Sequence, residues 1–358
     1  MYSDSDLEAA VAAGALTPQA ADALRAYVAR TRSTPAVDEE HFRLLTGFND
    51  IFVAIAAVIL LVALAWIGNS IRVGPPEMPS PLGGAFVAAA AWGLAEFFTR
   101  ERRMALPSII LLLAFVGGVF ATCAFTVANI VSEATLQDNE VLQGLIGAGC
   151  AAVAAVAAWV HWRRFRVPIT IAAGAAAVAG IGAGLVASAV QDAPQLREVM
   201  LGFTLVAGLA IFLFAMWWDS SDPKRETRRS DVAFWLHLLA APMIVHPIFS
   251  LLGLTDGQAS VPEAVIVLLV YVLLGLTALA IDRRALLVSA LAYVLWALSD
   301  LFERFGAVEL SFALTALLIG SALLLLSAFW HHARRAVVRP LPAGLQARLP
   351  MVDRPATV

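Results

Sequence analysis

Ten apolar stretches separate the charged segments of this chain, and they constrain its fold more than any other feature. A helix needs about 20 apolar residues to cross the hydrocarbon core of a bilayer. The ninth stretch is the weakest, because only the 15 residues from Ala285 to Ser299 are free of charge. Arg284 and Asp300 would have to reach opposite interfaces from that helix. The sequence predicts about ten transmembrane helices, at residues 51–71, 82–98, 106–131, 141–161, 167–190, 199–218, 232–252, 262–281, 284–301 and 310–330.

The composition also indicates an integral membrane protein. The 358 residues are 60% hydrophobic and 14% charged, whereas about 25% of residues are charged in ordinary soluble proteins. A soluble fold of this size has no way to bury so much apolar surface. The net charge of −3 gives no reason to expect a nucleic acid as a partner. We therefore expect an all-α, polytopic membrane protein whose main partner is the lipid bilayer.

Arginine doublets recur between the apolar stretches at nearly even intervals, beginning in the segment TRERRMALP. If the N-terminus lies in the cytoplasm, 21 of the 24 basic residues fall in cytoplasmic segments. Such an excess is the positive-inside signal that orients helices in membranes. It predicts five hairpins of the same orientation, with both chain ends in the cytoplasm. The doublets then act as cytoplasmic topology anchors and need no ligand: Arg102 and Arg103, Arg163 and Arg164, Arg228 and Arg229, Arg283 and Arg284, and Arg334 and Arg335.

Two explanations of the even spacing remain open. The first two doublets share the pattern Arg-Arg-x-x-x-Pro, which places Pro107 and Pro168 in the first turn of the next helix. One explanation is an internal repeat, with hairpins related by an axis along the membrane normal. The other is that orientation alone requires basic turns. Arginine then fills them because Lys224 is the single lysine of the chain.

The N-terminal 30 or so residues differ from the rest of the chain and predict a small helical hairpin. Ser5 and Glu8 fit a capping box, in which each side chain bonds a free backbone donor near the other. Gly14 is then placed to end this first helix. Thr17 as N-cap and Pro18 at the first helical position start a second one. A hairpin of this size has no core of its own, so we expect it to pack on the membrane domain or on a protein partner.

The same segment, LEAAVAAGALTPQAADALRAY, carries a resemblance to a known family. The family pattern is a leucine, a glycine seven residues later, a hydrophobic residue followed by Ser or Thr, and then Ala and Leu. Most of it is supplied by Leu7, Gly14, Leu16, Thr17, Ala21 and Leu24, with one extra residue between Gly14 and Leu16. Followed by many short hydrophobic spans, this pattern resembles a bacterial family of predicted polytopic membrane proteins of unknown function. The resemblance covers about 25 residues plus the general architecture. It implies no catalytic residues, because the family has no assigned activity.

Polar side chains inside the third apolar stretch form one candidate site. Thr122, Thr126 and Asn129 are spaced to share one face of a helix. A polar stripe of this kind would line a path for a small molecule or an ion, since polar groups at membrane depth are costly unless they are used or paired. Alternatively, the threonine hydroxyls bond to their own helix and the asparagine bonds a neighbouring helix.

A histidine in the seventh stretch completes this candidate intramembrane site. His246 lies about 21 Å along the predicted helix, by the rise per residue, and next to Pro247. Since the pKa of histidine lies near neutrality, His246 is suited to carry protons near a proline kink. It is equally suited to be a neutral packing residue. His237 lies near the cytoplasmic interface, where a histidine has no need of a special role.

Five carboxylates lie at the ends of the predicted helices, and we interpret them as partners of interfacial ion pairs: Asp50, Glu96, Asp219, Asp282 and Asp300. The chain contains no HExxH, GxSxG, CxxC or P-loop pattern. Cys123 and Cys150 both lie in apolar runs and indicate neither a disulfide framework nor a metal site. We therefore predict no catalytic residue, no metal site and no cofactor.

Together these features predict four regions and a general role. Residues 1–35 form a cytoplasmic helical hairpin, residues 36–50 a linker, residues 51–335 the transmembrane domain, and residues 336–358 a disordered cytoplasmic tail. The predicted location is a bacterial inner membrane. The function favoured is a non-catalytic scaffold, assembly or sensor role, with a protein partner at the hairpin. The alternative is a small-molecule or ion transporter with a polar path near Thr126, Asn129 and His246.

Overall fold

The computed structural model of the protein is built from helices. It describes residues 7, 10–31, 48–75, 78–131, 135, 139–190, 195–223, 225, 227–252, 261–284, 287–291, 294–295, 298 and 311–352. Of these residues, 85% are helical and none lies in a strand. The chain divides into an N-terminal unit and a second unit from Arg43 to Val352. The predicted all-α class is therefore confirmed for the described part of the chain.

The N-terminal unit contains the predicted hairpin. Residues 10–12 are helical, and a turn at Gly14, with φ of +72°, leads to α2 (Pro18–Thr31). Thr17 caps this helix, since its Oγ1 accepts a hydrogen bond from the backbone nitrogen of Ala20 at 3.2 Å. Ala21 is buried in the hairpin. The expected capping box of Ser5 and Glu8 lies outside the described residues, as do residues 36–47 of the expected linker.

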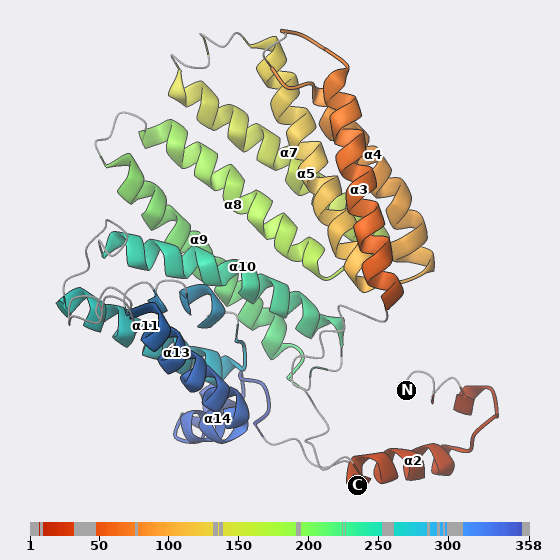
Figure 1. Ribbon diagram of the computed structural model, residues 1–358, viewed down its shortest axis with the longest axis vertical. Coiled ribbons are helices and arrows are strands. Elements are labelled where there is room, and N and C mark those ends of the chain that lie inside the picture. The colour runs from red at the N-terminus through yellow and green to blue at the C-terminus, as the bar shows by residue number, and fades with distance from the viewer. Residues whose placement is uncertain are drawn as a thin grey trace. The chain divides into compact units, whose positions relative to one another are not determined.

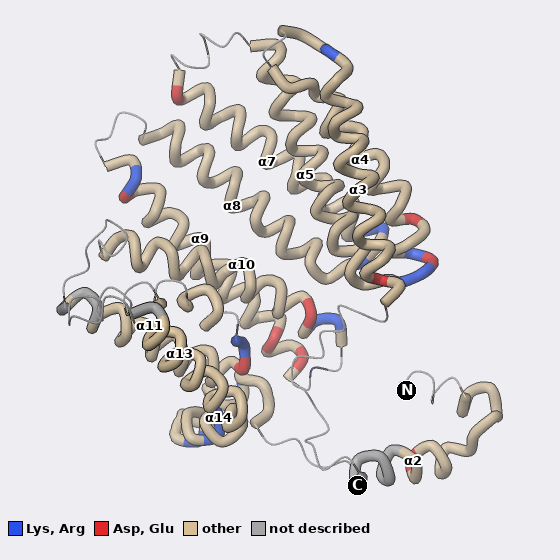
Figure 2. The backbone as a smooth tube through the Cα atoms, viewed as in Figure 1, with Lys and Arg blue, Asp and Glu red and all other residues tan. Residues whose placement is uncertain are grey.

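Seven helices of the second unit are long and apolar enough to cross a membrane, and they coincide with the first seven predicted spans. Their bodies carry almost no charge, and charged residues gather at their ends and in the turns (Figure 2). The α4 span continues through a π-helical segment, η1 (Glu96–Glu101). The seven helices are α3 (Phe48–Ser70), α4 (Pro81–Ala95), α5 (Ala105–Ile130), α7 (Glu140–Phe165), α8 (Ile169–Val190), α9 (Leu196–Ser220) and α10 (Arg228–Leu251).

The three remaining predicted spans fall in a less regular region. α11 (Val261–Ile281) is the eighth span, and its described apolar part from Val265 to Ile281 is short. Half of the ninth predicted span lies outside the described residues, and residues 287–291, 294, 295 and 298 of it are helical. α13 (Ser311–Ala328) is the tenth, and it bends by 76° into α14 (Trp330–Val338). Counting this bent pair as one span gives up to eight candidate spans among the described residues, against the ten expected.

The C-terminal tail differs from the expectation of disorder. α14 extends to Val338, and a short helix, α15 (Ala343–Gln346), follows it. The Gln346 side chain donates hydrogen bonds to the carbonyls of Arg339 and Leu341. The order arises because α14 is amphipathic and buries Trp330, Arg334 and Val338. Periodicity over nine residues was too short a signal to predict this helix.

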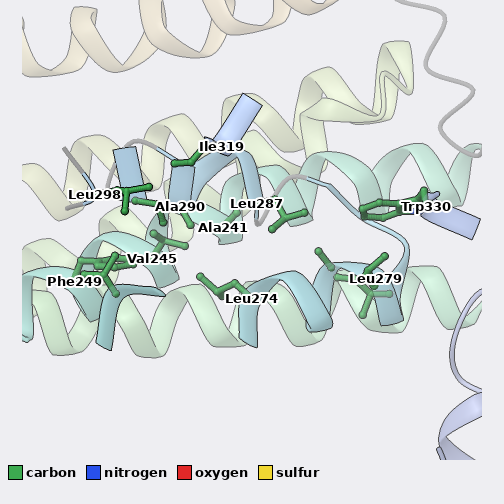
Figure 3. Close-up of a cluster of buried hydrophobic side chains, with 14 residues drawn as sticks. Ala241, Val245, Phe249, Leu274, Leu279, Leu287, Ala290, Leu298, Ile319 and Trp330 are labelled. Carbon is green, nitrogen blue, oxygen red and sulfur yellow. The ribbon is translucent and has the colours of Figure 1, made fainter. Parts of the chain in front are cut away.

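Consecutive helices pack as antiparallel hairpins: α4 with α5, α7 with α8, and α9 with α10 (Figure 1). α3 packs on α4 and α5, α5 packs on α7, and α8 packs on α9 and α10. The C-terminal helices share a hydrophobic core with α10, to which Phe249 and Val245 contribute (Figure 3). Trp330 and Leu287 lie in this same core. The fold is therefore a chain of hairpins joined side by side.

The turns of four hairpins share an unusual backbone conformation. Among the described residues, the non-glycine residues with positive φ are Arg103, Arg166, Arg225 and Asp282, at 53°, 55°, 54° and 58°. Each lies in the turn at the arginine-rich end of a hairpin. This left-handed conformation costs about 1–2 kcal/mol for a residue with a side chain. The residue directly follows the helix at Arg166 and Asp282, and it lies further along the turn at Arg103 and Arg225.

Glycines bring the backbones of two hairpins into direct contact. A Cβ atom on Gly144 of α7 would lie 2.6 Å from the carbonyl oxygen of Gly184 in α8. A Cβ atom on Gly84 of α4 would likewise lie 2.6 Å from the carbonyl oxygen of Gly118 in α5. Gly184 makes the reciprocal approach, since a Cβ atom on it would lie 2.5 Å from the carbonyl oxygen of Gly144. Backbone contact of this kind is how helices pack where lipid supplies no hydrophobic drive between them.

We expect Gly144→Ala and Gly147→Ala, on the same helix, to have opposite effects on stability. The Gly144 change forces two backbones apart and should destabilise the protein by about 1–3 kcal/mol, as overpacking does. A Cβ atom at Gly147 meets nothing within 4 Å. That variant should gain up to about 1 kcal/mol from the helix propensity of alanine. Thermal unfolding of both variants in detergent measures the difference, and equal shifts would contradict the close crossing.

Candidate functional site

The predicted polar stripe of α5 is bonded within the structure. The hydroxyls of Thr122 and Thr126 each donate to a backbone carbonyl four residues earlier in α5, at 2.7 and 2.6 Å. The amide nitrogen of Asn129 donates to the carbonyl of Pro79, before α4, at 2.9 Å. It also donates to a carbonyl of its own helix at 2.7 Å. These bonds are the ones expected if the three side chains serve helix packing.

His246 lies apart from that stripe. It is exposed on the surface of α10, which packs on α8 and α9. The threonines and Asn129 belong to α5, which packs on α3, α4 and α7. Figure 1 shows α7 and α8 between α5 and α10. The structure therefore keeps Thr122, Thr126 and Asn129 together on one helix face and does not bring His246 to them.

The second predicted doublet forms an ion pair that joins two hairpins. The guanidinium of Arg164 in α7 donates to both oxygens of Glu96, at 2.7 and 2.8 Å. Glu96 also pairs with Arg100, one helical turn away, at 3.3 Å. Arg164 and Glu96 are both partly exposed, and surface pairs of this kind contribute about 0–1 kcal/mol. The interfacial ion pair predicted for Glu96 is present, with its bidentate partner in a different hairpin.

The largest group of buried charges lies elsewhere, at the ends of α9, α11 and α14. We call it the buried charge cluster. Each of its side chains is at most 5% exposed where the ion pairs are formed. Side chains from five separate segments contribute to it: Asp219, Arg225, His237, Asp282, Arg283, Trp330 and Arg334.

Asp219, in the last turn of α9, is one centre of the cluster. Its Oδ1 accepts a hydrogen bond from Arg283 at 2.6 Å, and its Oδ2 lies 3.0 Å from Nε2 of His237. Arg283 also donates to the carbonyl of Ser230 at the start of α10, at 3.0 Å. The first arginine of the fourth doublet is therefore buried against a carboxylate of a different hairpin.

Asp282, in the turn after α11, is the second centre. Its Oδ2 accepts a hydrogen bond from Arg225 at 2.9 Å, and its Oδ1 accepts one from the indole nitrogen of Trp330 at 2.8 Å. The guanidinium of Arg334 lies 3.7 Å from the same Oδ1. Arg225 also bonds the backbone carbonyls of residues 281 and 282. This one carboxylate thus ties together the α9–α10 turn, the end of α11 and α14.

Arg334 extends the cluster to the C-terminal tail. Its two terminal nitrogens donate to the carbonyl oxygens of Pro350 at 2.6 Å and Met351 at 3.0 Å. The backbone nitrogen of Met351 lies 3.5 Å from the carbonyl oxygen of Pro223, in the α9–α10 turn. The first arginine of the fifth doublet therefore holds the tail against the membrane domain. This contact explains why the tail is folded as far as Val352.

Local geometry positions the charged groups. The α9–α10 turn is closed by Asp222, whose Oδ2 accepts hydrogen bonds from the nitrogen and the hydroxyl of Thr227 at 2.9 and 2.7 Å. Thr227 in turn caps α10. Arg225 and Asp282, which pair with each other, are two of the residues with positive φ. Ionic contacts of this strength compensate the cost of that backbone conformation.

Arginines outnumber carboxylates in the cluster by three to two. Burial lowers the pKa of Arg225 from its usual value, and the charge of Arg283 lowers it further. The carboxylates of Asp282 and Asp219 raise that pKa again. The remaining positive charge is stabilised by hydrogen bonds to the backbone carbonyls of Ser230, Pro350 and Met351.

The hydrogen bonds and ion pairs of the cluster indicate that it holds the helix ends together and is not a reaction centre. Both carboxylates already accept bonds from two groups each, so neither is placed to act as a base toward a substrate. No three His, Cys, Asp or Glu side chains of the described residues come together as metal ligands. Replacing one member would leave a buried charge without its partner, which is a large energetic penalty.

Sequence reasoning missed this cluster. Asp219 and Asp282 were expected in interfacial pairs, and His237 was given no role, although it is fully buried against Asp219. Trp330, which was given no role either, is 2% exposed. A signal was present at one doublet, because Asp282 directly precedes Arg283 and Arg284. The pairing partners, however, are 57 and 64 residues apart in the chain.

Comparison with known proteins finds no matching family model, no matching curated protein and no matching solved structure. The resemblance of the N-terminal segment to a bacterial membrane-protein family therefore stays a prediction.

We expect Asp219→Asn to destabilise the protein strongly. The change leaves Arg283 buried without its counter-charge, a loss of about 3–5 kcal/mol. The control is the same chemical change at a partly exposed ion pair, Glu96→Gln, for which we expect about 0–1 kcal/mol. The measurement is thermal or denaturant unfolding of both variants in detergent. An equal loss of unfolding free energy in the two variants would show that the buried ion pairs stabilise the protein no more than an exposed pair does.

Proposed function

We propose that this protein is a non-catalytic scaffold, assembly or sensor protein of a bacterial inner membrane. Its working surface in this proposal is the cytoplasmic side, where the N-terminal hairpin binds a protein partner and the tail is held by the buried charge cluster. The observation that carries the proposal is that the charged side chains of the buried charge cluster are already bonded within the protein. Its carboxylates and arginines bond one another and the tail backbone, which leaves a rigid platform rather than reactive groups.

The polar groups at membrane depth support the same class of function. Thr122, Thr126 and Asn129 bond backbone carbonyls of α5 and of the segment before α4. A transport path would need these groups to share a cavity with His246, which is exposed on α10, a helix that packs on α8 and α9. The contacts therefore favour a scaffold, assembly or sensor role over the transport alternative.

The proposed orientation rests on the charges. Of the 24 basic residues, 21 fall on one side if the hairpins alternate, and the cytoplasmic side attracts such an excess. The four described non-glycine residues with positive φ lie in turns that the proposal assigns to this side. In this proposal both chain ends lie in the cytoplasm.

Cysteine labelling in intact bacterial spheroplasts tests the orientation. In a chain with both native cysteines replaced, Gln195→Cys lies before α9 and Ser221→Cys lies after it, and both positions are exposed. A membrane-impermeant maleimide should label the cysteine at 195 and leave the one at 221 unlabelled until the membrane is opened. Labelling of the 221 cysteine in intact spheroplasts would reverse the proposed orientation.

Deletion of residues 1–35 tests the proposed role of the hairpin. The shortened chain should keep its melting temperature and lose a protein that co-purifies in fixed ratio with the full-length chain. Leu24, which is 39% exposed on α2, offers a point change, Leu24→Asp, that should have the same effect. Gln19→Asp on the same helix is the matched control and should keep the partner. A full-length chain that purifies without a fixed-ratio partner would contradict the proposal.

A further inference from the structure

A half-open groove lies between the C-terminal helices, beside the buried charge cluster. It has a volume of about 180 Å³. Leucines and a valine from residues 287–291 and from α13 form its walls, and an arginine and a tryptophan lie at one end. The residues that line it include Arg284, Leu287, Leu291, Leu323, Leu326 and Trp330. The groove thus combines an apolar length with one cationic end.

The cationic end is held in place by the cluster. The guanidinium of Arg284 lies 4.8 Å from the centre of the Trp330 ring, in a cation–π contact. Trp330 is itself fixed, because it is 2% exposed and its indole nitrogen bonds Asp282 at 2.8 Å. The two arginines of this doublet therefore differ, because Arg283 is ion-paired with Asp219 and Arg284 lies beside the groove.

Arg284 also differs from the other cluster arginines in its charge balance. Arg225, Arg283 and Arg334 each lie within 4 Å of a carboxylate oxygen. Within the described part of the chain, no carboxylate lies within ion-pair distance of Arg284. Its hydrogen-bond donors are thus available to an anion from outside the chain. A planar guanidinium of this kind binds a phosphate through two parallel hydrogen bonds.

We propose that this groove binds one anionic phospholipid, with an acyl chain along the leucine walls and the phosphate on Arg284. The 76° bend between α13 and α14 supports this occupant. Leu323 and Leu326 belong to the apolar α13, and Trp330 begins the amphipathic α14. The groove therefore passes from a hydrocarbon environment to the depth of lipid headgroups. Basic pockets between transmembrane helices on the cytoplasmic side recognise anionic headgroups in this way.

A soluble anion or a protein segment fits these observations less well. A free phosphate would gain nothing from the leucine and valine side chains, which form most of the lining beside a single serine, Ser327. A polar peptide would leave its backbone groups unbonded against them. A lipid satisfies both ends of the groove at once. This inference is independent of the proposed scaffold role, because it rests on the groove alone.

Native mass spectrometry of the full chain in detergent tests the proposal with two lipids of the same acyl chains, phosphatidylglycerol and phosphatidylcholine. We expect one phosphatidylglycerol to be retained per chain, in preference to phosphatidylcholine. Arg284→Gln should weaken phosphatidylglycerol binding at least tenfold, and Arg284→Lys should weaken it less. Arg163→Gln is the matched control, because Arg163 makes the same kind of contact with Trp159, at 5.4 Å, away from the groove. That variant should bind as the wild type does.

A second variant distinguishes the contribution of the apolar groove from that of the charge on Arg284. Leu323→Trp fills the apolar walls and leaves Arg284 in place, and it should also lose the bound lipid. If Arg284→Gln does not fold, the Leu323→Trp variant decides alone. Equal binding of the two lipids, or wild-type binding by the Leu323→Trp variant, would overturn the proposal. So would an equal loss in the Arg163→Gln control, which would indicate general attraction of lipid to basic residues. A chain dimer that Arg284→Gln dissociates would assign the groove to a second copy instead.

Discussion

A charge buried away from water has to meet a charge of opposite sign, and this requirement shapes the C-terminal half of the membrane unit. Asp219 and Asp282 lie at the ends of two different helices, and each is bonded by arginines from other segments. The pairs join α9, α10, α11 and α14 at a single place. If one partner moved, a charge would be left in a medium of low dielectric, so the segments are held as one body.

The first half of the unit depends on a different constraint. Two hairpins cross with glycine backbones in contact, at Gly84 and Gly118 and at Gly144 and Gly184. Turns with one left-handed residue recur after α4, α7, α9 and α11. The first half of the unit therefore relies on close backbone contact between helices, and the C-terminal half relies on buried ion pairs.

Function depends on the polar groups that these two sets of contacts do not occupy. Most polar groups of the described helices are bonded to backbone or to each other, which favours a platform over a reaction centre or a polar path. Arg284 is the exception within the cluster region, because it faces an apolar groove and has no carboxylate partner among the described residues. The same cluster that locks the tail also fixes Trp330 and, through it, Arg284. In the proposed complex, binding of the lipid to Arg284 would therefore depend on the arrangement of the buried charge cluster.

The amino-acid sequence by itself determined the all-helical class, the limits of the first seven apolar helices and the turn at Gly14 and Thr17. These features follow from local rules, since an apolar run of sufficient length has to form a helix in a bilayer and caps act over a few residues. Only the tertiary structure decided which arginine of a doublet is buried, and that Arg283 meets Asp219 across 64 residues. It also decided that the tail folds onto Arg334. Ion pairs depend on distance in space, and a charge pattern along the chain carries no information about which distant turn will lie beside it.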